Sequence, residues 1–243
     1  MNNTVHVSAV ELREKVPKDT YLHKLPVVKH LTKKGKIEFT KPVTFLVGEN
    51  GTGKSTLVEA IAVCMGFNAE GGTLNFNFST CDSHSELYKY ITVWKTANRI
   101  KDGFFLRAES FYNVASYVDE VDVARYYGGK SLHDQSHGES FLALMENRFT
   151  GNGIYILDEP EAALSPNRLM RLMVLINELV KNNSQFIIST HSPILMSFPG
   201  ADVYQLSEEG IDLVSYQETE HFQITKTFIN SPDKMLNYLL SDR

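Results

Sequence analysis

The sequence predicts an α/β fold in which a parallel or mixed β-sheet is flanked by helices. Three short, mainly apolar runs are typical of strands that are covered on both faces; they are Val43–Val47, Ile154–Leu157 and Gln185–Ser189. Segments with helical character follow the first two runs. This alternation favours parallel strands joined by right-handed crossovers, which place helices on the faces of the sheet.

The two helices are expected to pack differently. Residues 55–67 are apolar on nearly every side, with Glu59 as the sole charge, which indicates a helix buried against the sheet. The helix after the second run has Ser165 as a plausible N-cap and Pro166 at its first position. Its apolar residues recur at helical spacing: Leu169, Leu172, Met173, Ile176, Leu179 and Val180. A last helix is expected to start near Ser231.

The middle of the chain predicts a less regular, inserted lobe. We expect a single domain made of a core lobe, residues 1–80 and 150–243, and an inserted lobe of about 81–149. Within the insertion, Tyr90–Ala97 and Phe104–Arg107 flank the polar stretch NRIKDG, which suggests a small β-hairpin. The pattern from Ser110 to about Phe149 is mostly helical.

Composition places the chain among ordinary globular proteins. It has 243 residues, of which 42% are hydrophobic, and a formal net charge of -5. The charge argues against a surface that coats nucleic acid, so a DNA partner is open but unsupported. No apolar run reaches the roughly 18 to 20 residues that cross a bilayer, and no signal peptide is evident, so we expect a cytoplasmic chain with no direct membrane insertion. Cys64 and Cys81 are expected to be reduced thiols.

The string GENGTGKS, residues 48–55, matches the G-x-x-x-x-G-K-[ST] pattern of phosphate-binding loops. It lies between the first predicted strand and the first predicted helix, which is the context that such a loop requires. Its glycines allow several backbone N–H groups to converge on a phosphate, and the helix N-terminus adds partial positive charge. Lys54 is expected to contact the β- and γ-phosphates, and the Ser55 hydroxyl to ligate Mg²⁺. The predicted nucleotide-binding residues are Gly48, Glu49, Asn50, Gly51, Thr52, Gly53, Lys54, Ser55 and Thr56.

Two acidic residues follow the second strand in the string IYILDEP. Ligands of open α/β sheets bind at the carboxyl ends of the strands, so both carboxylates should face the phosphate loop. Asp158 is expected to hold Mg²⁺, and Glu159 to orient or deprotonate the water that attacks the γ-phosphate. Glu161 is interpreted as structural or exposed.

Four motifs, taken in order, resemble those of ATP-binding-cassette (ABC) ATPases over most of the chain: GENGTGKS at 48–55, QSHGE at 135–139, IYILDEP at 154–160 and STHSP at 189–193. The sequence around these motifs is also similar to that of small ATPases often labelled AAA family, near the recombination and chromosome-maintenance (RecF- and SMC-like) branch. The resemblance implies a P-loop NTPase fold, ATP and Mg²⁺ as ligands, and ATP hydrolysis.

The resemblance also implies a site shared between two copies of the chain. In the family, a histidine contacts the γ-phosphate, and signature residues contact the nucleotide that the opposing subunit holds. These roles fall on His191, which would act with Lys54 and Glu159 in catalysis, and on the signature residues Gln135, Ser136, His137, Gly138 and Glu139. A homodimer that forms on ATP binding is therefore expected.

Several positions depart from the family pattern. No glutamine lies between the phosphate loop and Gln135, so the glutamine that links Mg²⁺ to the helical lobe is missing. Glu109, which ends the run FFLRAE, is the candidate substitute and a candidate Mg²⁺ ligand. The signature has His137 and Glu139 in place of a glycine and a glutamine. Tyr21 is the candidate for stacking on adenine, and the alternative is a tyrosine of the core or surface.

Three functions remain open at this point. The first is an ATPase whose two copies sandwich two ATP molecules and act as a nucleotide switch on an unknown target. The second is an ATP-gated clamp for DNA ends or a protein, with slow hydrolysis. The third is the ATPase subunit of a membrane transporter, ranked lower because the coupling glutamine is absent. A small-molecule kinase explains neither QSHGE nor His191.

Overall fold

A six-stranded sheet forms the centre of the protein, in a computed structural model that describes residues 4–73, 85–111 and 137–241. Its strand order is β5-β6-β7-β3-β8-β9. The strands are β3 (Val43–Gly48), β5 (Asp102–Arg107), β6 (Gly153–Asp158), β7 (Gln185–Ser189), β8 (Asp202–Leu206) and β9 (Ile211–Val214). Neighbouring strands are parallel except for the last pair, β8 and β9. The predicted α/β class and its three buried strands are confirmed.

A second, antiparallel sheet of three strands packs beside the first. It is formed by β1 (Val7–Leu12), β2 (Lys36–Glu38) and β4 (Ile91–Lys95), in the order β2-β1-β4. The amide of Gln185 in β7 joins the two sheets. Its Oε1 accepts hydrogen bonds from the backbone N–H groups of His6 and Val7, both at 2.8 Å, and its Nε2 donates to the Val7 carbonyl at 2.8 Å.

The predicted hairpin in the middle of the chain is wrong. β4 pairs with β1 in the second sheet, whereas β5 pairs with β6 in parallel in the central sheet. The physical reason lies in β5, whose residues Phe104, Phe105 and Leu106 are all buried and therefore require cover on both faces. Residues 102–107 thus belong to the central sheet, not to an inserted lobe, and the further division into lobes stays a prediction.

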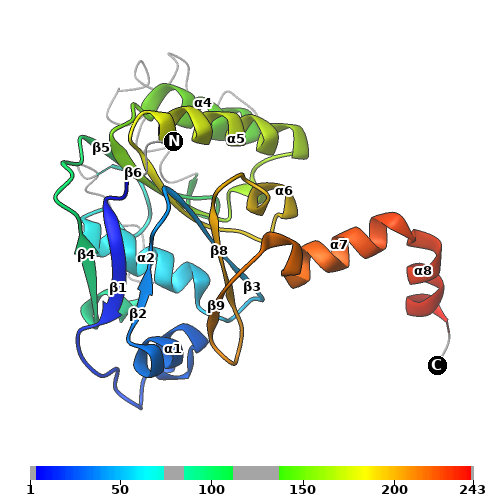
Figure 1. Cartoon of the computed structure of the whole chain (residues 1–243), viewed down its shortest axis with the longest axis horizontal. Coiled ribbons are helices and arrows are strands. Elements are labelled where there is room, and N and C mark those ends of the chain that lie inside the picture. Colours follow the sequence, from blue (N-terminus) through cyan, green and yellow to red (C-terminus); the bar gives the residue numbers. More distant parts are fainter. Residues whose placement is uncertain (1–3, 74–84, 112–136, 242–243) are drawn as a thin grey trace.

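Helices cover both faces of the central sheet (Figure 1). Adjacent residues of each strand alternate between two hydrophobic clusters: Phe45 packs toward α4, α5 and α6, and Leu46 packs toward α1 and α2. The helices are α1 (Pro26–Lys34), α2 (Lys54–Met65), α4 (His137–Arg148), α5 (Pro166–Lys181) and α6 (Pro193–Met196). Short 3-10 helices are η1 (Tyr21–Lys24), η2 (Glu86–Lys89), η5 (Pro160–Ala162) and η6 (Tyr216–Glu218). The predicted helices after the first two strands are confirmed as α2 and α5.

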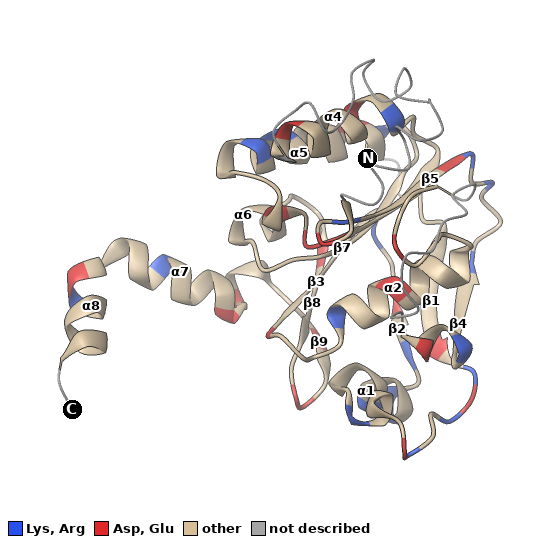
Figure 2. Cartoon of the chain, turned by 180° about the vertical axis from the view of Figure 1, so that it is seen from behind, with Lys and Arg blue, Asp and Glu red and all other residues tan. Residues whose placement is uncertain are grey.

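The last two helices extend away from the body of the protein (Figure 1). They are α7 (Glu220–Asn230) and α8 (Pro232–Leu240), and neither contains a buried residue. Charged residues are sparse along both (Figure 2). α8 confirms the helix predicted near Ser231. In the described part of the chain, no helix is long and apolar enough to cross a membrane.

Asp102 organises the start of β5 and its neighbours. Its carboxylate accepts hydrogen bonds from the Thr150 backbone and hydroxyl and from the Tyr155 hydroxyl, each at 2.8 Å, and pairs with Arg148 at 2.9 Å. Burial raises the pKa of Asp102, but the hydrogen bonds from Thr150 and Tyr155 outweigh it and hold that pKa below its usual value. These contacts therefore stabilise the charged form of Asp102 in the folded protein.

We expect Asp102→Asn to lower the free energy of unfolding by about 1–3 kcal/mol at pH 7, because a charged acceptor is replaced by a neutral one. A depressed folded pKa contributes stability above the unfolded value of about 4, and that contribution is lost as the pH falls through the folded pKa. The difference between wild type and variant should therefore shrink below about pH 4. Urea unfolding across pH measures it, with exposed Asp19→Asn as the control; a difference that is constant with pH would contradict the assignment.

Candidate nucleotide site

The loop between β3 and α2 adopts a backbone that only glycine tolerates at two positions. Gly48 has φ 140° and Gly53 has φ 94°. A Cβ added at Gly48 would lie 2.1 Å from the carbonyl oxygen of Leu206, and one at Gly53 would lie 2.6 Å from a methyl carbon of Val27. Strand, glycine loop and helix N-terminus thus occur together, as the motif predicts.

Lys54, the first residue of α2, is buried within this loop. Its Nζ donates hydrogen bonds to the carbonyls of Gly48 at 2.6 Å and Glu49 at 3.0 Å. Burial lowers the pKa of Lys54, and the nearby carboxylates of Glu159 and Asp158 oppose this shift. A cavity of about 130 Å³ opens beside it, lined by Leu25, Asn50, Gly51, Gly53, Lys54, Ser55, Thr56 and Glu159.

Asp158 ends β6 and is almost completely buried next to the same loop. Its carboxylate accepts hydrogen bonds from the hydroxyls of Ser189 and Ser55, and Arg107 Nε lies 3.4 Å away. Burial raises the pKa of Asp158, whereas these three neighbours favour its charged form. A buried carboxylate and a serine hydroxyl are therefore in contact at the point where the sequence predicts a cation.

Glu159 turns away from the strand because its backbone is left-handed, with φ 50° and ψ 52°. Such a conformation is uncommon for a residue with a side chain and often marks functional sites. The Glu159 N–H donates to the Ser189 carbonyl at 3.1 Å, which fixes the turn. The turn brings Glu159 Oε1 to 3.4 Å from Nε2 of His191, which follows β7. The predicted acid and histidine thus lie together.

Glu161 has a structural role, which is one of the two interpretations that the sequence allowed. It lies in η5, and its carboxylate accepts a hydrogen bond from the His191 backbone N–H. Burial raises the pKa of Glu161, and the hydrogen bond from His191 opposes that shift. The side chain therefore connects the loop after β6 to the loop after β7.

Glu109 lies in the first residues after β5, where its side chain is 87% exposed. It lines a cavity of about 310 Å³ with Ser55, Ala108, Asp158, Glu159 and Ala162. Sequence reasoning missed Arg107 in the same region: Nη1 lies 2.7 Å from Glu59 in α2, and Nη2 lies 3.5 Å from Glu109. The partly buried guanidinium of Arg107 therefore joins α2, β5 and the end of β6.

The described residues include only part of the signature QSHGE. Gln135 and Ser136 lie outside the described residues, and α4 begins at His137. A Cβ at Gly138 would lie 2.7 Å from the Ala163 carbonyl, so close packing against the start of α5 already accounts for this glycine. Glu139 pairs with Arg168 of α5 at 3.0 Å. Contacts of these residues with a second copy stay a prediction.

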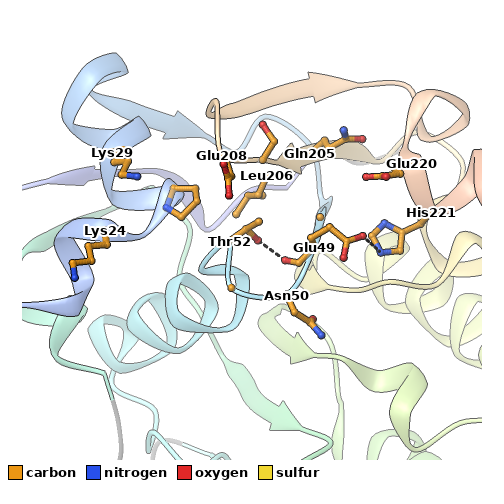
Figure 3. A pocket seen from close by; sticks show the side chains of 14 residues that line it. Lys24, Lys29, Glu49, Asn50, Thr52, Gln205, Leu206, Glu208, Glu220 and His221 are labelled. Atoms are coloured by element: carbon orange, nitrogen blue, oxygen red, sulfur yellow. Dashed lines mark hydrogen bonds and ion pairs between the residues drawn. The ribbon is translucent and has the colours of Figure 1, made fainter.

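A larger cavity of about 550 Å³ opens on the outer side of the phosphate loop (Figure 3). Side chains from η1, α1, the loop, the β8–β9 turn and α7 line it, among them Lys24, Lys29, Glu49, Asn50, Glu208, Glu220 and His221. Tyr21, the residue guessed to stack on adenine, is 59% exposed and does not line the described cavities. His221, which the sequence reasoning also missed, lies beside Glu49 in the lining of this cavity (Figure 3).

The described side chains fit a magnesium nucleotide by their chemistry. Mg²⁺ prefers oxygen ligands, and the Ser55 hydroxyl, the Asp158 carboxylate and the Glu109 carboxylate border one cavity. The glycine loop and buried Lys54 supply positive charge and N–H donors for phosphate on the adjoining side. When bound, the cation would neutralise charge on the phosphates.

Comparisons with known proteins find similarity to AAA domains and to ABC ATP-binding proteins. A family model described as "AAA domain" matches residues 27–133, and one described as "AAA domain, putative AbiEii toxin, Type IV TA system" matches residues 138–197. An "Uncharacterized ABC transporter ATP-binding protein" of Haemophilus influenzae is 26% identical over 71% of this chain and 74% of its own length. The "Ribose import ATP-binding protein RbsA" of Bacillus cereus is 25% identical over 63% of this chain and 35% of its own length.

Among solved structures, cbiO1 from Clostridium perfringens, part of the ABC transporter complex cbiONQ, has a TM-score of 0.53 at 18% identity and covers 98% of this chain and 100% of its own. The chain has the fold of ABC-type P-loop ATPases, and it is similar to AAA domains and to ABC ATP-binding proteins. The two AAA-domain models together contain the phosphate loop, Asp158, Glu159 and His191. Proteins of this type bind ATP, generally with Mg²⁺, and ATP hydrolysis is the general activity that these similarities support.

Proposed function

We propose that the protein hydrolyses ATP with Mg²⁺ at two composite sites in an ATP-sandwiched homodimer, and that it acts as a nucleotide switch on a target. The observation that carries this proposal is the position of Glu159, which lies 3.4 Å from His191 and borders the cavity that Lys54 and Ser55 also line. A phosphate in that cavity would lie between a buried cation and a potential base.

Each side chain has a defined role in the proposed reaction. Lys54 and the loop N–H groups hold the phosphates, and Ser55 and Asp158 hold the cation. Glu159 orients the attacking water and accepts its proton, and His191 Nε2 donates to the γ-phosphate. Ser136 and Gly138 of the second copy complete the site, because a helix N-terminus favours an anion.

A second candidate function is that of the ATPase subunit of a transporter. The similarity to the Haemophilus influenzae and Bacillus cereus proteins favours it, since one is named an ABC transporter ATP-binding protein and the other a ribose import ATP-binding protein. Co-purification with a membrane protein would favour this alternative. An ATP-gated clamp would instead retain DNA or a protein partner in an ATP-dependent way.

Mixing two inactive variants tests the shared site. In a head-to-tail dimer, a Glu159→Gln copy and a Ser136→Arg copy together form one intact site and one site that carries both changes. We expect each variant alone to have little activity, and a one-to-one mixture to recover up to about a quarter of the wild-type rate, because at most about half of the dimers are mixed and each mixed dimer has one intact site. A mixture no more active than its components, in which mixed dimers form, would contradict the composite site.

A further inference from the structure

Both ring nitrogens of His191 have partners, and they come from different parts of the chain. Nε2 lies 3.4 Å from Glu159 Oε1, next to the phosphate loop. On the other side of the ring, Nδ1 lies 2.8 Å from Nε2 of His221, the second residue of α7. The two rings meet edge to face, with centroids 4.8 Å apart. The contact joins the proposed catalytic histidine to the base of the C-terminal helices.

A hydrogen bond between two imidazole nitrogens requires one donor and one acceptor. A phosphate oxygen can only accept, so His191 must carry a proton on Nε2 to bond to it. In the neutral ring, Nδ1 is then an acceptor, and the proton between the rings must belong to His221 Nε2. Burial lowers the pKa of His191, with Lys54 acting in the same direction, which favours the neutral ring that this arrangement requires.

The surroundings hold His221 in place. Thr219, which caps α7, is fully buried, and its hydroxyl accepts a hydrogen bond from the Phe222 N–H at 3.4 Å and donates one to the Tyr216 carbonyl at 2.6 Å. The Phe222 ring packs edge to face against Tyr216, with centroids 5.2 Å apart. On the cavity side, Glu49 Oε1 lies 3.8 Å from His221 Nε2 (Figure 3). The first turn of α7 is thus anchored, although the rest of the helix is exposed.

We propose that His221 is a positioning residue: its Nε2–H donates to His191 Nδ1, and it thereby fixes both the orientation of the His191 ring and the proton on His191 Nε2 that faces the γ-phosphate. This inference rests on the proposed function, since it assigns a role within that ATPase site. Residues that orient a functional histidine through its second nitrogen fix its tautomer and orientation in the same way at metal sites, where their loss typically costs about 10–100-fold.

His221→Leu removes the donor, and His221→Gln keeps a neutral N–H donor on a side chain of comparable reach. We expect kcat for ATP to fall about tenfold in His221→Leu with KM changed less than about twofold, and to return most of the way in His221→Gln. In a His191→Ala background, His221→Leu should have no further effect, because the two residues act as one unit. Thr227→Leu, in the exposed part of α7, is the matched control.

The nitrogen-15 shifts of the His191 ring provide a readout that does not need activity. They are assigned by loss of the signals in His191→Gln and measured without nucleotide. Wild type and His221→Gln should show the neutral ring protonated at Nε2, and His221→Leu a mixture of tautomers. Protonation at Nδ1 in wild type, or an equal effect of His221→Leu in the His191→Ala background, would overturn the proposal. A wild type without ATPase activity but with the expected ring would overturn the proposed function instead.

Discussion

Glu159→Gln is expected to bind ATP and to hydrolyse it about 10²–10⁴-fold more slowly than wild type, because the amide cannot accept the proton of the attacking water. The change is nearly isosteric, and the side chain is only half-buried, so the fold should be retained. Glu159 also borders the cavity next to Lys54, and its Oε1 lies 3.4 Å from His191 Nε2, so the carboxylate lies beside the proposed phosphate site. Steady-state phosphate release and ATP binding, measured separately, check both parts of the prediction.

The matched control for Glu159→Gln is Glu209→Gln in the exposed turn between β8 and β9, which should hydrolyse ATP at the wild-type rate. Turnover of Glu159→Gln at the wild-type rate would show that another group acts as the base. Equal losses in rate and in ATP affinity would point instead to a binding role for Glu159.

Lys54→Ala is expected to weaken ATP binding by about 10²-fold, or roughly 3 kcal/mol, because a buried ammonium that can bond to the phosphates is lost. Nζ now bonds to the carbonyls of Gly48 and Glu49, which hold it inside the loop. Calorimetric titration with ATP and Mg²⁺ measures the affinity, and thermal unfolding shows whether the variant is folded.

Lys33→Ala, an exposed change at the end of α1, is the control for Lys54→Ala and should leave the affinity unchanged. A folded Lys54→Ala variant that binds ATP as tightly as wild type would contradict the position of the phosphates in the small cavity. An equal loss of affinity in Lys33→Ala and Lys54→Ala would show that the loss does not depend on the position of Lys54 in the loop.

The central strands could be predicted because a strand that is buried on both faces is a short run of mainly apolar residues. All residues of β3, β6 and β7 are buried and most are apolar, and helices with clear starts follow β3 and β6. The strands of the second sheet lack such an apolar run: β2 has three residues, and β4 is only partly buried. A short strand with one exposed face gives too weak a pattern, and its partners are remote in the chain.

The hairpin error had the same origin. β4 and β5 are separated by a short polar turn, and closeness in sequence favours pairing between neighbours. The signal that could have separated them is the difference in their burial patterns: β5 is apolar on both faces, whereas the outer end of β4 is exposed at Trp94 and Lys95. Strands with one and two covered faces belong in different layers.

In the candidate site, the motif residues could be found because their chemistry is local. The phosphate loop and the acidic pair are each contained in one short string, and the structure brings both to the same cavities. Arg107 and His221 lie in no motif, and their contacts with Asp158 and His191 join segments far apart in the sequence. A charged residue at the end of an apolar strand was the one available sign for Arg107.

Light scattering of Glu159→Gln with and without ATP and Mg²⁺, repeated with Ser136→Arg added, tests the proposed shared site most directly. We expect ATP to convert the Glu159→Gln chain from monomer to dimer and Ser136→Arg to abolish that shift, because the signature of each copy contacts the nucleotide of the other. A chain that binds ATP with Mg²⁺ and stays monomeric would contradict the homodimeric site.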